Sequence, residues 1–125
     1  MRVMKFILCL LLVLGMSIAA QRSAAGPLED GWEAVSRNDY VAALRIWQPL
    51  AERGIPGGQY CLGFLYENGR GVPQDYVLAY MWLNLAASSG DPASAMYRDR
   101  LAAMMTSSQV AEAQRLTREW KPRRQ

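Results

Sequence analysis

The chain of 125 residues has no histidine and only two cysteines, Cys9 and Cys61. Histidine is the commonest general base and metal ligand, and it usually activates a serine or cysteine nucleophile. Without it, the common catalytic triads and zinc sites are excluded, and no base can be assigned to Cys61. The 11 carboxylates are scattered along the chain rather than gathered in a motif. We therefore expect no catalytic residues, no metal site and no cofactor.

Long apolar runs are also scarce, and the longest, residues 6–18, is shorter than the roughly 20 residues that span a bilayer. Arg2 and Lys5 precede this run and small residues follow it, which is the pattern of a cleaved export signal. We predict that residues 1–25 form such a signal, cleaved between residues 19 and 20 or between residues 25 and 26. The mature protein is then expected to be periplasmic or secreted from a bacterium.

The chain also lacks a strong excess of positive or negative charge. The 14 basic residues exceed the 11 acidic ones, but Arg2, Lys5 and Arg22 lie in the predicted signal, so the charges of the remaining chain nearly balance. Such a domain lacks the basic footprint of nucleic-acid binding, and no nucleic-acid partner is expected. Cys9 lies in the same signal, so no intramolecular disulfide is expected either.

One strongly patterned stretch, residues 57–90, contains two short helix-like segments joined by a glycine turn. Its fixed positions are Leu62, Gly63, Leu65, Tyr66, Gly69, Gly71, Val72, Asp75, Tyr76, Ala79, Trp82, Ala86, Ala87 and Gly90. This pattern resembles the Sel-one-like repeat (SLR), a relative of the tetratricopeptide repeat (TPR). With the export signal, the resemblance implies a small exported bacterial member of that family. It also implies an all-α fold, a short right-handed solenoid of helical hairpins.

Packing explains the residue types in this stretch. Gly63, Ala79 and Ala86 lack bulk, which suits positions where helix axes approach closely. Gly69 and Gly71 are suited to positive φ in the turn between the helices. The turn is not a phosphate-binding loop, because no strand precedes it and no Lys-Ser or Lys-Thr pair follows it.

The chain repeats itself at an offset of 36 residues. The paired identities are Asp39 with Asp75, Tyr40 with Tyr76, Val41 with Val77, Ala43 with Ala79, Ala51 with Ala87, Gly54 with Gly90 and Pro56 with Pro92. A period of this size with a helix-pair pattern is typical of an α-solenoid. We predict about three hairpins in residues 26–125, of which the central one matches the family pattern best and the others are divergent.

Capping residues mark where helices should begin. Asp39, Asp75 and Asp91 are predicted N-caps, because a short carboxylate accepts from unpaired N–H groups of the first turn. Thr106 and Gln109 form a predicted capping box. The expected helices cover residues 28–37, 40–53, 58–68, 93–105 and 107–120, and a further helix-like run follows the Asp75 cap and continues to residues 86–90.

Two further expectations concern the C-terminal part. In the third hairpin, Ala95, Met96, Leu101 and Met104 are the expected core residues. The basic segment at residues 121–125 is expected to fray.

The resemblance also implies where a partner would bind. TPR-like solenoids present the first helix of each hairpin on a concave surface. On the helix expected over residues 58–68, the candidates for the concave face are Cys61, Phe64, Leu65 or Asn68. The predicted partner contacts among them are Cys61, Phe64 and Asn68. The predicted function is that of a non-enzymatic, exported module that binds a protein or peptide partner.

Two alternatives are left open. One is an enzyme directed at the cell wall or at β-lactams, since some cysteine-rich secreted relatives have been linked to β-lactam binding. Those relatives carry a cysteine pair in each repeat, which this chain lacks. The other is an assembly factor anchored in the membrane by an uncleaved signal; without that anchor no membrane contact is expected. Weak self-association through the exposed end of the stack is also left open.

Overall fold

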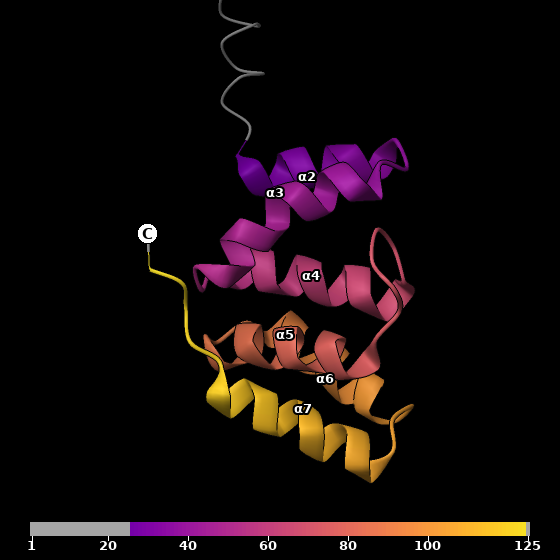
Figure 1. The fold of residues 1–125 in the computed structure, drawn as a ribbon, viewed down its shortest axis with the longest axis vertical. Coiled ribbons are helices and arrows are strands. Elements are labelled where there is room, and N and C mark those ends of the chain that lie inside the picture. The colour runs from indigo at the N-terminus through magenta and orange to yellow at the C-terminus, as the bar shows by residue number, and fades with distance from the viewer. Residues whose placement is uncertain (1–25, 125) are drawn as a thin grey trace, which may run out of the picture.

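The structure is a computed structural model, and it describes residues 26–124. These residues form six helices and no strand, which confirms the predicted all-α solenoid. The helices are α2 (Pro27–Ser36), α3 (Tyr40–Glu52), α4 (Pro56–Asn68), α5 (Tyr76–Ser88), α6 (Pro92–Ala102) and α7 (Ser107–Glu119). Figure 1 shows them stacked from the α2–α3 end to α7. The predicted export signal, residues 1–25, lies outside the described residues.

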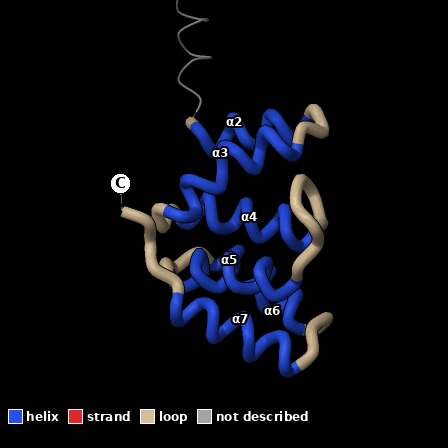
Figure 2. Tube along the Cα trace, in the orientation of Figure 1, coloured by secondary structure: helices blue, strands red, loops and turns tan. Residues whose placement is uncertain are grey.

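Each helix packs mainly against its neighbours in the chain, as Figure 2 shows for the three successive hairpins. The exception is α7, which packs chiefly on α5 of the central hairpin. As a result α5 contacts α4, α6 and α7, and residues from Ala79 to Leu83 are all buried. A helix that is apolar on nearly every side suits this central position.

The predicted helix starts are confirmed by their hydrogen bonds. Asp39 Oδ1 accepts from the Ala42 N–H at 3.1 Å, and Asp75 Oδ1 accepts from the Leu78 N–H at 3.0 Å. Asp91 accepts from the Ser94 N–H at 3.2 Å. Both bonds of the predicted capping box at the start of α7 are present. Because a cap depends only on residues within one turn, the sequence alone predicts it well.

Close helix approaches occur at the expected glycines and at others. A Cβ on Gly63 would come within 2.8 Å of Leu83 Cγ, so α4 and α5 require glycine there. A Cβ on Gly58 would come within 2.8 Å of the Ala51 backbone nitrogen, so the contact between α3 and α4 also requires glycine. In the turn, Gly69 and Gly71 have φ of 60° and 70°, as predicted.

The third hairpin differs from the sequence prediction. Leu101 is buried as expected, but Met96 is 60% exposed and Met104 is 55% exposed. The helix ends at Ala102, where the Met104 N–H donates to the Leu101 carbonyl in a tighter, three-residue turn. Because of that turn, Met104 does not lie on the apolar face of α6. Met96 lies on the outer side of this helix.

Residues 121–124 also lie against the stack, so the prediction that this segment frays is wrong for these residues. The Arg123 N–H donates to the Glu52 carbonyl at 2.8 Å, and its guanidinium lies 3.2 Å from the Glu52 carboxylate. In Figure 1 this segment runs from α7 back along the side of the stack toward the first hairpin.

Between residues 26 and 124, no helix combines the length and the apolar character needed to cross a membrane.

Candidate partner-binding pocket

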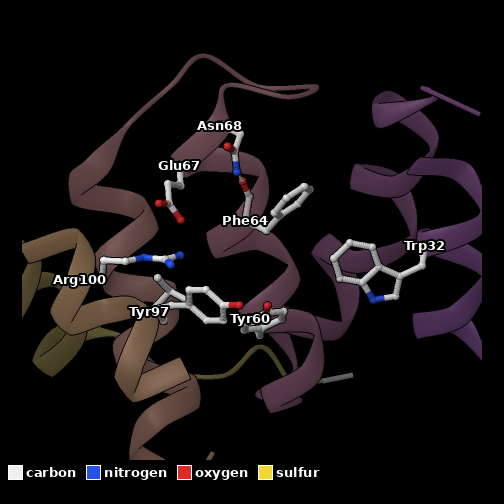
Figure 3. A pocket seen from close by; sticks show the side chains of 8 residues that line it. Trp32, Tyr60, Phe64, Glu67, Asn68, Tyr97 and Arg100 are labelled. Atoms are coloured by element: carbon white, nitrogen blue, oxygen red, sulfur yellow. Dashed lines mark hydrogen bonds between the residues drawn. The ribbon is translucent and has the colours of Figure 1, made fainter. Parts of the chain in front are cut away.

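A pocket of about 330 Å³ opens on the side of the stack formed by the first helices of the three hairpins. We call it the aromatic pocket. Its lining residues are Trp32 of α2, Tyr60, Phe64, Glu67 and Asn68 of α4, Leu83 of α5, and Tyr97 and Arg100 of α6. Figure 3 shows the labelled side chains, which come from α2, α4 and α6, around the pocket.

Trp32 is held at one end of the pocket although it is 40% exposed. Its ring lies edge-on to the buried Trp47 ring, with centroids 4.8 Å apart, and 5.4 Å from the Phe64 ring. Trp47 in turn fills the space left by Gly31 and donates from Nε1 to the Leu28 carbonyl at 3.2 Å. The exposed indole is thus oriented by a packed core residue behind it.

Two tyrosines and an arginine form the opposite wall. The Tyr60 and Tyr97 rings lie 5.7 Å apart, and the Arg100 guanidinium carbon lies 4.6 Å from the Tyr97 ring centroid. Such a cation–π contact restrains the guanidinium plane while its N–H edges stay available. Burial, followed by the neighbouring Tyr97, raises the pKa of Tyr60; its hydroxyl, protonated at neutral pH like that of any tyrosine, can donate or accept a hydrogen bond.

The last turn of α4 supplies the polar end of the pocket. Asn68 donates from Nδ2 to the Phe64 carbonyl at 2.8 Å, which fixes its amide. In Figure 3 the Glu67 carboxylate and the Arg100 guanidinium lie at the end away from Trp32. The ion pairs found within residues 26–124 include neither Glu67 nor Arg100.

The predicted contact residues fall into two groups. Phe64 and Asn68 line the aromatic pocket, whereas Cys61 is only 2% exposed and packs in the core. Cys61 is therefore removed from the predicted contact set. Cys61 precedes Phe64 by three positions, so its side chain points in a different direction around the helix and faces the core. Burial raises the pKa of its thiol to about 12.

Sequence reasoning missed Trp32, Tyr60, Glu67, Tyr97 and Arg100. A signal for two of them was present in the repeat. The 36-residue offset that pairs Pro56 with Pro92 also pairs Phe64 with Arg100. Residues 37–39 connect α2 to α3, whereas residues 69–75 connect α4 to α5, so the first connection is four residues shorter. An offset of 32 then pairs Trp32 with Phe64.

The side chains that line the pocket are suited to non-covalent binding. They offer aromatic faces, hydroxyl and guanidinium donors, one carboxylate and one amide. Within the described range, no group of three or more cysteine, aspartate or glutamate side chains gathers in a way that could hold a metal.

Two adjacent matches to the family model of the Sel1 repeat cover residues 18–55 and 56–91, more than half of the chain. The chain belongs to the Sel1 repeat family. The boundary between the matches falls between α3 and α4, so each Sel1 repeat contains one helical hairpin of the structure. The predicted family is thereby confirmed, and Sel1 repeats typically mediate interactions between proteins.

This Sel1 repeat protein also matches the proteins called DAP3-binding cell death enhancer 1 from Rattus norvegicus and Mus musculus. Each is 42% identical to it over 45 residues, which are 36% of this chain. The matched segment spans only 9% of the length of these curated relatives. No solved structure matches the chain.

Proposed function

We propose that the chain is an exported, non-enzymatic module that binds a protein or peptide partner in the aromatic pocket. The pocket itself carries this proposal. Four aromatic side chains and an arginine converge there from three helices, and Trp32 is partly exposed. Tryptophan, tyrosine and arginine are the residues that most often dominate binding energy at protein interfaces.

Two observations support this function. Repeat solenoids use extended surfaces of this kind for binding, and the name of the curated relatives, DAP3-binding cell death enhancer 1, describes a protein that binds another protein. Export is supported by the basic residues, the apolar run and the small residues within residues 1–25.

Site-specific photo-crosslinking tests the binding surface. A photoreactive phenylalanine analogue is placed at Asn68, which lines the pocket, or at Gln114, which is exposed on α7 and serves as the control. After illumination in the native host, we expect the Asn68 variant to form a covalent adduct with one defined protein. Adducts of equal yield from both positions, or none from either, would contradict binding in the pocket.

Intact mass tests export. The chain is produced in a Gram-negative host and the periplasm is released by osmotic shock. We expect a soluble species that begins near residue 20 or residue 26. A full-length mass confined to the membrane fraction would instead show an anchored protein.

A further inference from the structure

We infer that a basic patch at the end of α3 binds the anionic surface of a phospholipid membrane. The patch consists of Arg53, Lys121, Arg123 and Arg124, and none of these residues lines the aromatic pocket. The inference therefore adds a second interaction surface to the proposed function. It relies on that proposal only for the export of the chain.

The fold brings the patch together from two distant parts of the chain. A Cβ on Gly54 would lie 3.6 Å from the Trp120 ring and 3.8 Å from Pro122 Cβ. The Arg123 N–H donates to the Glu52 carbonyl at 2.8 Å. Residues 52–54 and 120–123 thus lie side by side, where the C-terminal segment reaches the first hairpin in Figure 1. The sequence alone shows three cations in a tail, and folding places Arg53 beside them.

The backbone of the C-terminal segment turns basic side chains outward. Trp120 is extended, with φ of −68° and ψ of 138°, and Lys121 precedes a proline, which also favours an extended backbone. Successive side chains of an extended segment point to opposite sides. Since Trp120 and Pro122 face Gly54, the residues that alternate with them face away from it. These residues, Lys121 and Arg123, are exposed.

Two carboxylates, Glu52 and Glu119, are near neighbours of the patch along the chain, and each already has a partner. The Glu52 carboxylate accepts from Gln48 Nε2 at 3.2 Å and lies 3.2 Å from the Arg123 guanidinium. Glu119 lies 2.7 Å from the guanidinium of Arg115, which is outside the patch. Neither carboxylate pairs with the other three cations of the patch.

The patch as a whole carries an excess of positive charge. Arg53, Lys121 and Arg124 are exposed, and the ion pairs found within residues 26–124 include none of them. The four basic residues and Glu52 contribute +4 and −1, which leaves +3. Such an excess on one surface attracts polyanions, and salt screens the attraction.

The observations favour a membrane over a nucleic acid. Clusters of about four to eight lysines and arginines are typical of surfaces that bind anionic phospholipid headgroups. Nucleic-acid-binding domains instead have a strongly basic overall charge, whereas the charges of this chain beyond its proposed signal nearly balance. The proposed export would also place the chain beside membranes and away from nucleic acid.

Vesicle co-sedimentation tests the inference. The vesicles contain phosphatidylglycerol and phosphatidylcholine in a ratio of about 1:2, and vesicles of phosphatidylcholine alone are the control. In about 50 mM salt, we expect the chain to bind the anionic vesicles at least about tenfold more tightly than the neutral ones, and about 500 mM salt should abolish the difference. Equal binding to both kinds of vesicle, or binding to neither, would overturn the inference.

Two double variants locate the contact, each compared with wild type in the same processed form of the chain. Lys121→Gln with Arg124→Gln keeps the Arg123 contacts and should weaken binding to anionic vesicles about 25-fold, roughly fivefold for each charge removed. Arg37→Gln with Arg45→Gln removes the same charge from exposed positions outside the patch and should change binding by less than about twofold. Equal losses in the two variants would show an effect of overall charge and overturn the inference.

A DNA duplex serves as the competitor. If the duplex, at equal phosphate concentration, displaces the chain from the anionic vesicles, the patch prefers nucleic acid and the inference is overturned.

The inference and the proposed function can fail separately, because the two surfaces share no residue. If the chain does not bind vesicles but the Asn68 crosslink captures one defined protein, only the membrane contact is refuted. If vesicle binding depends on the patch but no crosslink forms, the membrane contact stands and the function of the pocket is refuted.

Discussion

At the scale of single residues, Gly31 shows how a missing side chain positions the binding surface. The absence of a Cβ lets the Trp47 indole lie against α2, and Trp47 then supports the exposed Trp32 ring. A Cβ at residue 31 would fall 2.1 Å from Trp47 Nε1. A side chain at residue 31 would therefore have to displace the Trp47 indole.

Gly31→Ala is therefore expected to lower the free energy of unfolding by about 1–3 kcal/mol, the usual cost of overpacking a core. Gly57→Ala is the matched control, since its Cβ would meet only the end of the flexible Leu28 side chain. Urea denaturation followed by circular dichroism measures both. A Gly31→Ala protein as stable as the Gly57→Ala protein would show that Trp47 has room to move.

Cys61 gives a second test at this scale. Because burial raises the pKa of its thiol to about 12, its thiolate at pH 8 is about a thousandfold scarcer than that of a cysteine with the ordinary pKa of about 8.5. In a Cys9→Ser background, maleimide is expected to label the native protein far more slowly than the urea-unfolded protein. Equal labelling rates would show an accessible thiol.

The same shift predicts how stability depends on pH. The folded state keeps the Cys61 proton to a higher pH than the unfolded state, so its contribution is complete below about pH 8.5 and is lost as pH rises above that value. Burial also raises the pKa of the Tyr66 hydroxyl, so Tyr66 changes the stability in the same direction as Cys61. The free energy of unfolding should fall above pH 8.5, and less steeply in Cys61→Ala. Parallel pH profiles for wild type and variant would exclude this contribution.

At the scale of helices, N-terminal caps stabilise the helices that the sequence pattern predicts. Asp75→Ala removes the acceptor for the Leu78 N–H at the start of the central helix α5. The expected loss is about 1 kcal/mol. Gln114→Ala, at an exposed position in the middle of α7, is the control. Thermal unfolding compares the two, and equal melting temperatures would argue that the cap contributes nothing.

Helix starts and the repeat period could be predicted because they depend on neighbours along the chain. The end of α6 could not, because the tight turn at Leu101 competes with an apolar pattern that continues to Met104. The same limit applies to the pocket. Phe64 was identified from one helix, but Trp32 and Arg100 join it only through the relative positions of α2, α4 and α6. The inward rotation of Cys61 also depends on that packing.

At the scale of the whole molecule, the C-terminal segment links the last hairpin to the first. Trp120 packs edge-on to Trp82 with ring centroids 6.1 Å apart, and Trp120 and Pro122 both lie beside Gly54. The Arg123 N–H then donates to the Glu52 carbonyl at 2.8 Å. A short solenoid leaves its ends exposed, and this segment covers part of the junction between α3 and α4.

The contribution of this link resides in the backbone and in Pro122 rather than in the charge of Arg123, whose side chain is 78% exposed. Exposed ion pairs contribute little, so Arg123→Ala should change the free energy of unfolding by less than about 0.5 kcal/mol. Removing residues 121–125 should cost about 1–2 kcal/mol, because a hydrogen bond and an apolar contact are lost together. Arg123→Pro, which removes the N–H donor together with the side chain and fixes φ, should fall between them. If Arg123→Ala proved as destabilising as the truncation, the ion pair with Glu52 would be the link instead.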